Sequence, residues 1–443
     1  MPYDKIVYII DSVASFVIFF FLCFLWYYLS YFVIATKKPK QFPKAEEKAS
    51  FGILVPARNE SKVIRNILES LSKLDYPVDK YGVYIIVETL EDPTCEICKE
   101  YGPNVHIIVR GDLTNRRTKG FALDDAYHYL KNKNIHYDAY MIFDADNVVS
   151  SNYLLLMNDV YQAGYQIGVG YRSFTNATKN WICSCSATLF SFMNQFTSKG
   201  RTYLFKKATL TGTGYFIRSE IVDDAGGWIW NGMTEDVELT TYCYYHNITM
   251  CYYPFARYFD EQAEKMGVLR KQHVRWVWGF FENRKRFKEG HKVYQPESKR
   301  KRRNSLIEYN SSIYPFLILV VSLLVCAIAS LVIAIIGNVR GFEDYGWLYA
   351  HAAFQFSLLY ITFVFIAAFT LGIDNKNLKF SGGRCVIVCL TYIFFFQSFL
   401  IAFLEGLFCK KKRTNWVVIE HKGDIVDKQA LEANNKNASK WKT

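Results

Sequence analysis

The chain has 443 residues, which is enough for one α/β domain of ordinary size and a membrane region, or for two soluble domains. Its 53 Lys and Arg against 41 Asp and Glu give a net charge of +12, but the basic runs at 37–40, 299–303 and 410–413 lie near apolar segments, which argues against nucleic acid as a partner. The 11 cysteines lack the spacing of a disulfide framework, so we exclude a secreted, disulfide-stapled fold and expect reduced packing residues.

The first predicted element is an apolar segment at 12–35. It carries no charge and is long enough to cross a hydrocarbon core of about 30 Å. No small-residue cleavage site follows it, so we expect an anchor rather than a removed signal peptide. Because the basic run at 37–40 comes next, residues 1–36 are predicted to form a transmembrane helix whose N-terminus lies outside the cell.

Residues 50–300 are soluble in character, and their first half alternates between two kinds of pattern. Strand-like apolar runs lie at 52–55, 83–87, 105–109 and 139–143, and helix-like stretches lie at 60–73, 93–101 and 118–132. This alternation predicts an α/β domain with a mostly parallel sheet and flanking helices. Ligands bind beyond the carboxyl ends of such strands, so we expect the polar residues there to meet in one crevice.

Three apolar segments follow within residues 311–409, at 313–336, 347–372 and 385–408. If all three crossed the membrane, the basic run at 410–413 would lie outside, against the usual charge distribution. We therefore expect one of them to lie in the membrane interface, and 385–408, with its Gln397 and Glu405, is the candidate. Residues 410–443 are predicted to be a cytoplasmic basic tail with a disordered end.

Two carboxylates, Asp144 and Asp146, follow the last of the four strand-like runs. Such a pair at a strand end makes a hard oxygen site for Mg²⁺ or Mn²⁺, and this metal would bring a diphosphate with it. The alternative is a pair of solvated turn residues, and the two acids by themselves leave both possibilities open.

A second acidic group is Thr234-Glu235-Asp236. It has the pattern of a helix start, with Thr as the cap and two acids at the positive end of the helix. A carboxylate in that position can also act as a general base toward a hydroxyl group. The sequence leaves these two interpretations balanced.

Two further patterns complete the candidate site. Gln272, Arg275 and Trp276 belong either to a basic amphipathic helix on a membrane surface or to a site where Gln and Arg hold phosphate oxygens and Trp stacks on a sugar. The glycines around Thr213 would let a ligand approach the backbone closely, as at Gly212.

In this order and ahead of apolar helices, the DAD, TED and QxxRW patterns resemble the processive family-2 glycosyltransferases. These are the membrane synthases of cellulose, mixed-linkage β-glucan, chitin, hyaluronan and poly-N-acetylglucosamine. The resemblance covers roughly residues 50–290. It implies a nucleotide-sugar-binding α/β domain of the GT-A type over residues 50–300, with interfacial helices toward its C-terminal part, followed by transmembrane and interfacial helices.

The resemblance also implies roles for single residues. It places the nucleotide and donor against Pro56, Arg58, Glu60, Glu88, Lys119, Asp144 and Gln272, with Asp92 as the alternative to Glu88. It assigns catalysis to Asp236 as the general base, Glu235 beside it and Arg275 at the leaving diphosphate, and acceptor binding to Gly212, Thr213 and Trp276. Asp146 would hold Mg²⁺ or Mn²⁺, and Trp416 is a hypothetical gate, by analogy with the gating loop of cellulose synthases.

The implied function is an inverting enzyme that builds a β-linked polysaccharide from a UDP-sugar and passes it across the bilayer. We favour UDP-glucose and a β-glucan, with mixed linkages as an option. Three alternatives are left open: UDP-N-acetylglucosamine as the donor, transfer of a single sugar to a lipid or short acceptor, and a non-catalytic nucleotide-sugar-binding scaffold. We expect a multi-pass plasma-membrane protein with a cytoplasmic catalytic domain and tail; a homo-oligomer or accessory secretion subunits are open questions.

Overall fold

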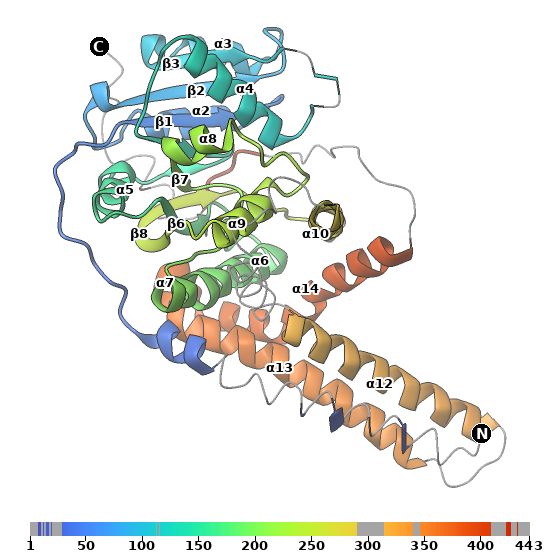
Figure 1. Ribbon diagram of the computed structural model, residues 1–443. Helices are drawn as coiled ribbons and strands as arrows, with labels where there is room; N and C mark the ends of the chain where they lie inside the picture. Colours follow the sequence, from blue (N-terminus) through green and yellow to red (C-terminus); the bar gives the residue numbers. More distant parts are fainter. Residues whose placement is uncertain are drawn as a thin grey trace.

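The computed structural model has two parts, an α/β domain and a set of helices that extends from it (Figure 1). It describes residues 8–9, 12, 15–16, 19, 29–111, 113–114, 116–289, 314–339, 346–408, 422–426 and 432. Most of the predicted N-terminal span and Trp416, the hypothetical gate, therefore lie outside the described residues.

The first half of the sheet confirms the predicted alternation. Its strands are β1 (Phe51–Pro56), β2 (Tyr81–Val87), β3 (Val105–Val109) and β4 (Ala139–Ile142), all parallel in the order β3-β2-β1-β4. The helices between them are α2 (Ile64–Leu71), α3 (Thr94–Lys99) and α4 (Lys119–Asn132), with short turns η1 (Val78–Lys80) and η2 (Gly102–Asn104). Strand β2 is buried along its whole length, which explains its uninterrupted apolar run.

The second half of the sheet adds antiparallel pairings to the predicted, mostly parallel arrangement, although β6 and β8 within it pair parallel. Its strands are β5 (Val148–Val149), β6 (Ile167–Phe174), β7 (Tyr215–Arg218) and β8 (Met250–Asp260), and the sheet continues from β4 in the order β7-β6-β8-β5. Strand β7 runs antiparallel to both β4 and β6, and β5 runs antiparallel to β8, so the whole sheet is mixed. Because Tyr215 pairs with Ile142, the loop before β7 lies beside the acids that follow β4.

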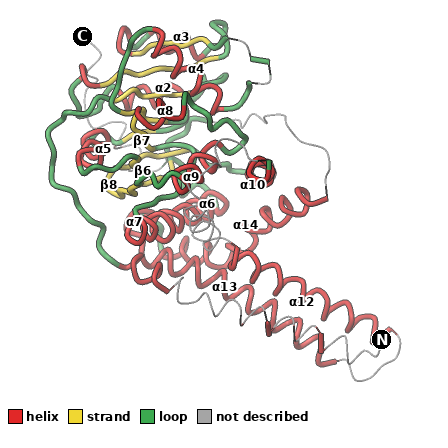
Figure 2. The backbone as a smooth tube through the Cα atoms, in the orientation of Figure 1, coloured by secondary structure: helices red, strands yellow, loops and turns green. Residues whose placement is uncertain are grey.

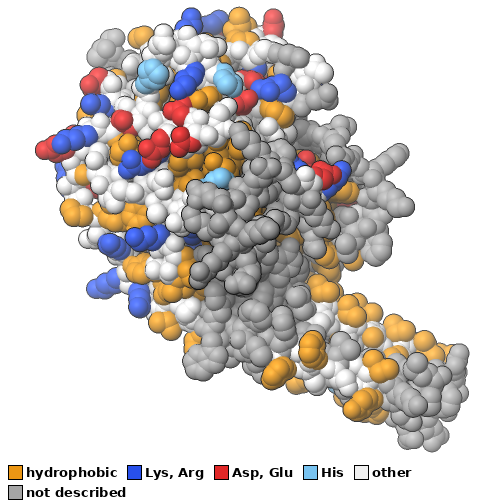
Figure 3. Space-filling model, in the orientation of Figure 1, with side chains coloured by type: hydrophobic (Ala, Val, Ile, Leu, Met, Phe, Trp, Pro, Cys, Tyr) orange, Lys and Arg blue, Asp and Glu red, His pale blue; other side chains and the backbone are white. Residues whose placement is uncertain are grey.

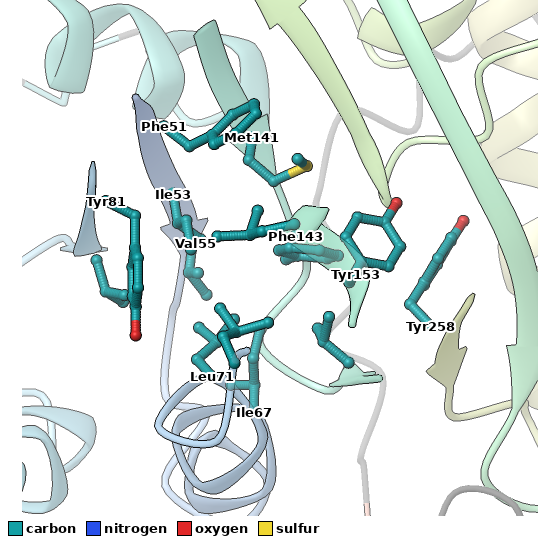
Figure 4. Packing of buried hydrophobic residues seen from close by; sticks show 14 of the residues in the cluster. Phe51, Ile53, Val55, Ile67, Leu71, Tyr81, Met141, Phe143, Tyr153 and Tyr258 are labelled. Carbon is teal, nitrogen blue, oxygen red and sulfur yellow. The ribbon is translucent and has the colours of Figure 1, made fainter. Parts of the chain in front are cut away.

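The helices of this half are α5 (Tyr153–Gln162), α6 (Trp181–Phe192), the π-helical turn η3 (Met193–Ser198), α7 (Lys199–Phe205), α8 (Ser219–Ala225) and α9 (Glu235–Tyr245). Alternating residues of β1 face opposite ways, as the two-residue period of a strand requires. Phe51, Ile53 and Val55 join the cluster drawn in Figure 4 with Ile67, Leu71, Met141, Phe143 and Tyr153, whereas Leu54 packs on the other face with residues of α4. Each fully buried aliphatic side chain contributes about 1.5–3 kcal/mol to stability, so this core fixes the strand ends that carry the polar residues.

Four long helices follow the sheet domain: α10 (Met266–Lys288), α12 (Tyr314–Val339), α13 (Gly346–Leu378) and α14 (Gly382–Phe408). Two stretches of described helix, Trp347–Leu378 and Gly382–Glu405, are long and apolar enough to cross a membrane, and Val320–Ile336 is a shorter apolar helix. In Figure 2, α12 and α13 form a projecting helical hairpin that carries no strand. In Figure 3 its visible surface is mainly hydrophobic, and the charged side chains gather over the sheet domain.

Helix α13 is anchored to the sheet domain by one buried carboxylate. Asp374 is fully buried and accepts hydrogen bonds from the hydroxyl of Tyr171 (2.6 Å) and the amide of Gln195 (2.9 Å). It also accepts from Ser191 and Asn377. A buried carboxylate is stable only when its oxygens are satisfied in this way, so the base of the hairpin is held in one orientation.

Helix α14 and the tail both return to the sheet domain. Near the start of α14, Arg384 donates to the hydroxyl of Ser184 on α6 (3.2 Å), and near its end Glu405 pairs with Arg270 on α10 (2.8 Å). Beyond it, the backbone N–H groups of Lys422 and Gly423 both donate to the carboxylate of Glu261 at 3.0 Å. Both ends of α14 and the described tail residues therefore lie on the same body as the sheet.

Candidate active site

The turn after β4 is locked by a residue that the sequence analysis missed. The side-chain oxygen of Asn147 accepts the backbone N–H of Asp144 (3.2 Å), and its amide donates to Oδ1 of Asp146 (3.1 Å). Asn147 is fully buried. An Asn directly after the DAD pattern is typical of side-chain-to-backbone turns, and that signal was available in the sequence. Asn147 therefore fixes the backbone at Asp144 and the direction of the Asp146 carboxylate.

The loop before β7 corrects the prediction for Thr213. Its side chain is fully buried; its hydroxyl accepts the N–H of Asp144 (3.0 Å) and donates to Asn147. This hydroxyl therefore holds the acidic turn and cannot bind an acceptor. Gly212, at φ +87°, is different, because the only described atom within 4 Å of a Cβ there would be Oδ2 of Asp236, at 3.8 Å. Gly212 thus borders an open space next to Asp236.

Lys119 lies between the two acidic groups. Its ammonium group pairs with Asp144, donates to the carbonyl of Gly212 (2.7 Å) and lies 4.0 Å from Oε1 of Glu235. Lys119 reaches this place because the start of α4 packs closely against the loop before α9. At the next residue, Gly120, a Cβ would lie only 2.0 Å from the carbonyl oxygen of Trp230. The prediction placed Lys119 near donor phosphates, and the structure adds that its charge links the two acidic motifs.

Glu235 and Asp236 form a coupled acidic pair in the first turn of α9. The pKa of Glu235 is raised to about 7, first by burial and second by the neighbouring Asp236, and the positive charge of Lys119 opposes this shift. Burial also raises the pKa of Asp236, against the positive charges of Lys119, Arg172 and Arg275. The pair is therefore protonated more readily than free carboxylates.

The helix-start alternative holds for the two acids, which lie in the first turn of α9, but the side chain of Thr234 makes no cap bond. Its hydroxyl instead accepts from the amide of Asn283 on α10 (3.0 Å). The motif is therefore held from outside its own helix.

Helix α10 carries the QxxRW residues and brings one of them, Arg275, to this acidic pair. The positive charge of Arg275 acts on Asp236. The ring of Trp276 lies edge-on to Phe190, 6.1 Å between centroids. Oε1 of Gln272 is buried and has no hydrogen-bond partner among the described residues, which is unusual for a native polar atom and fits a bound polar group.

Arg172 on β6 is a second cation that the sequence analysis missed. It is buried, pairs with Asp260 and donates to the carbonyl of Thr211 (2.6 Å). Its guanidinium lies 4.3 Å from the ring centroid of Phe190. An Arg inside an otherwise buried strand was the signal in the sequence, since a buried cation needs a partner.

At the ends of β1 and β2 the structure separates two alternatives. Both carboxylate oxygens of Asp92 accept backbone N–H groups, from Asn59 (2.7 Å) and Thr94 (2.8 Å), so this side chain is used to hold the loop. Glu88 instead pairs with Arg58 at 3.3 Å, and both are partly exposed. Of the two acids, Glu88 is the one placed to meet a ligand.

The remaining predicted residues of this loop lie next to that pair. Pro56 ends β1, and the backbone N–H of Glu60 donates to the hydroxyl of Thr94 (3.0 Å). Polar residues from the ends of β1, β2 and β4 therefore follow one edge of the sheet, as parallel strands require.

The sequence profile of the family described as glycosyltransferase-like family 2 matches residues 49–279, just over half of the chain. The probable glycosyltransferase YdaM of Bacillus subtilis is 29% identical over 252 residues, which are 54% of this chain and 57% of that protein. A beta-monoglucosyldiacylglycerol synthase of Nostoc sp. is 29% identical over 237 residues, 52% of this chain and 48% of that protein. The chain thus spans about half the length of these two relatives.

Two further comparisons cover more of the chain. A poly-beta-1,6-N-acetyl-D-glucosamine synthase of Staphylococcus epidermidis is 26% identical over 346 residues, 76% of this chain and 78% of that protein. The solved structure of the mannosyltransferase PcManGT from Pyrobaculum calidifontis, in complex with GDP-Man and Mn²⁺, matches 91% of this chain and 100% of that chain with a TM-score of 0.58 and 13% identity. At this identity the likeness is one of fold. The chain belongs to glycosyltransferase-like family 2 and is a glycosyltransferase.

Proposed function

We propose that this protein is an inverting, membrane-bound glycosyltransferase that extends a β-linked polysaccharide from a UDP-sugar. The observation that carries the proposal is the meeting of three separate motifs. Lys119 joins Asp144 to Glu235, and Arg275 acts on the adjacent Asp236. A base, a leaving-group cation and a nucleotide-binding carboxylate are the groups that direct displacement at an anomeric carbon requires.

In the proposed reaction, Asp236 takes the proton from a hydroxyl group of the acceptor sugar. The oxygen forms a bond to the anomeric carbon of the donor, and the bond from that carbon to the diphosphate oxygen breaks. The nucleoside diphosphate leaves with the electron pair, and the guanidinium of Arg275 stabilises its charge. Attack from the face opposite the leaving group converts an α-linked donor into a β-linked product.

The acidic turn fits Mg²⁺ or Mn²⁺ carried in with the donor. Asp146 is oriented by Asn147, whereas Asp144 is paired with Lys119. Within the described part of the chain there is no group of three or more His, Cys, Asp or Glu that would hold a metal ion. One or two carboxylates suit an ion that takes its other oxygens from a diphosphate and water. When bound, the ion would supply positive charge at the leaving diphosphate.

The acidic pair predicts a pH dependence of turnover. The reaction needs Asp236 ionised, and burial raises the pKa of both acids, that of Glu235 to about 7. The rate is therefore expected to start falling at a pH above the usual range of carboxylates and then to drop by about tenfold per pH unit as Asp236 becomes protonated. The measurement is kcat for UDP release across pH, with thermal unfolding recorded at each pH as the control. A rate constant that stays level down to about pH 5 would contradict the assignment.

Membrane placement follows from the helices. The hairpin of α12 and α13 exposes large apolar side chains such as Val325, Phe354 and Ile361, which suits lipid contact. The hairpin leads the chain away from the sheet domain and back to it. We place α14, whose start contacts α6 and whose end contacts α10, in the membrane interface, as the sequence analysis expected of 385–408. The basic tail then stays on the side of the catalytic domain, which we place at the cytoplasmic face of the plasma membrane.

The relatives favour a polymer over a glycolipid. The match to the poly-N-acetylglucosamine synthase covers 346 residues, which is more than the family profile at 49–279 accounts for, whereas the match to the glucosyldiacylglycerol synthase covers 237. The longer match therefore draws on the membrane helices as well as the catalytic domain. It also favours UDP-N-acetylglucosamine as an alternative to the UDP-glucose that the sequence analysis preferred.

The decisive experiment is a donor screen on the purified full-length protein in lipid nanodiscs with Mn²⁺. Radiolabelled UDP-glucose and UDP-N-acetylglucosamine are supplied separately, and the products are sized and digested with β-specific glycosidases. We expect long, β-glycosidase-sensitive chains from one of the two donors. A single lipid-linked sugar would replace the polymerase with the glycolipid function, and absence of any product from either donor would overturn both proposed donors.

A further inference from the structure

The face of helix α10 that carries Arg275 also makes a second set of contacts. Residues 275, 279, 282 and 286 are spaced by four, three and four positions and therefore form one stripe along the helix. Beyond Arg275 this stripe lies against residues 231–234, the loop that directly precedes Glu235 and Asp236. The helix that supplies the leaving-group cation thus also touches the chain that supplies the base.

The middle of the stripe holds the end of this loop. The carboxylate of Glu282 accepts the backbone N–H of Met233 (3.2 Å), and the amide of Asn283 donates to the hydroxyl of Thr234 (3.0 Å). Gly279 lets the helix backbone come close: a Cβ at this position would lie 2.3 Å from Cγ2 of Thr234. Any residue larger than glycine at this position would displace Thr234, the residue before Glu235.

The end of the stripe forms a buried ion pair with α9. Arg286 pairs with Glu238, whose side chain is fully buried, and donates to the side-chain oxygen of Asn231 (3.0 Å). Glu238 in turn accepts the backbone N–H of Gly232 (2.9 Å). Helix α10 therefore holds the two acids from both sides, because it contacts the loop before them and Glu238 after them.

We propose that Gly279, Glu282, Asn283 and Arg286, which we name the α10 clamp, are positioning residues that set the separation between Asp236 and Arg275. The inference rests on the proposed function for the roles of these two residues. Because the hydroxyl of Thr234, the N-cap residue of α9, accepts from Asn283 and makes no cap bond of its own, α10 holds the start of this helix. A misplacement of reacting groups by about 1 Å costs about 100-fold in rate, so a clamp of this kind controls turnover without touching substrate.

The first test is steric. Gly279→Ala is expected to lower kcat for UDP release by about 10- to 100-fold while the Kd for UDP, measured by calorimetry, changes less than about twofold, because only the base is displaced. Adding Thr234→Ser removes the methyl group nearest the new Cβ and should restore part of the lost kcat.

The second test uses the ion pair, in case the steric variant does not fold. Arg286→Gln removes the charge that faces Glu238, whereas Arg286→Lys keeps it and loses only the bond to Asn231. We expect kcat to fall in the order wild type, Arg286→Lys, Arg286→Gln, again with little change in the Kd for UDP. Lys285→Gln is the matched control, since Lys285 lies next in sequence, is mostly exposed and pairs with Glu289 on its own helix.

Wild-type kcat in folded Gly279→Ala or Arg286→Gln would overturn the clamp, and so would a loss of UDP affinity that matches the loss of rate. Asp236→Asn, run in the same assay, separates this outcome from failure of the proposed function. If Asp236→Asn is inactive and the clamp variants are normal, only the clamp is wrong. If Asp236→Asn turns over normally, the base assignment itself is wrong.

Discussion

Asp236→Asn is expected to reduce the rate of sugar transfer by about 10²- to 10⁴-fold and to leave UDP binding intact, because only the proton acceptor is lost. Asn has nearly the same shape as Asp, and the carboxylate it replaces accepts one described hydrogen bond, from the N–H of Val237 (2.9 Å). The change also removes a negative charge from a pair whose members repel each other, so Glu235 should become easier to ionise. The measurements are kcat for UDP release and the Kd for UDP by calorimetry.

The matched control is Asp224→Asn, an exposed acid on α8. It should leave both quantities at the wild-type level. Near-normal turnover in Asp236→Asn would mean that another group accepts the proton, and Glu235→Gln, made in the same background, would then show whether the neighbouring acid does so.

The second large effect is expected at the acidic turn. Asp146→Asn should abolish the dependence of donor binding on Mn²⁺ and lower turnover by about 10²- to 10³-fold, because the leaving diphosphate loses a source of charge neutralisation. Asn147 already fixes the orientation of this side chain, so the substitution changes the charge rather than the path of the turn. The Kd of the UDP-sugar is measured with Mn²⁺ and with a chelator.

Asp79→Asn, on the turn before β2, serves as the control because Asp79 is exposed and lies at the opposite end of the strands. If Asp146→Asn bound the donor as tightly as the wild type and with the same response to Mn²⁺, the ion would not sit on this carboxylate. Asp144 is a weaker candidate, since Lys119 already neutralises it.

Much of the first half of the domain could be predicted from the sequence because its signals are local. Apolar runs alternate with helical periods between residues 51 and 132, and β1 to β4 with their three helices formed within a few residues of the expected positions. In the second half helices also lie between the strands, but the strand directions are mixed. Antiparallel strand β7 enters between β4 and β6, and its pairing is decided by burial against strands distant in sequence.

The candidate site shows the same division. The DAD, TED and QxxRW residues were predicted because their chemical types and order are visible in the sequence. The roles of Thr213 and Asn147 depend on which atoms are buried together, and so does the choice of Glu88 over Asp92. The sequence of a glycine-rich loop is the same whether its hydroxyl and amide groups bind a ligand or another loop. Only the packing therefore identifies their partners.

The sequence by itself predicted an α/β enzyme with long apolar segments, and with acids, amides and an arginine suited to a nucleoside diphosphate. The tertiary structure decided how those groups meet. Lys119 lies between two acidic motifs, the charges of Arg172 and Arg275 act on Asp236, and α10 holds the turn that carries this acid. The reason is physical. Composition and periodicity follow from neighbours along the chain, whereas the direction and pKa of a charged side chain follow from burial and from charges that only folding brings close.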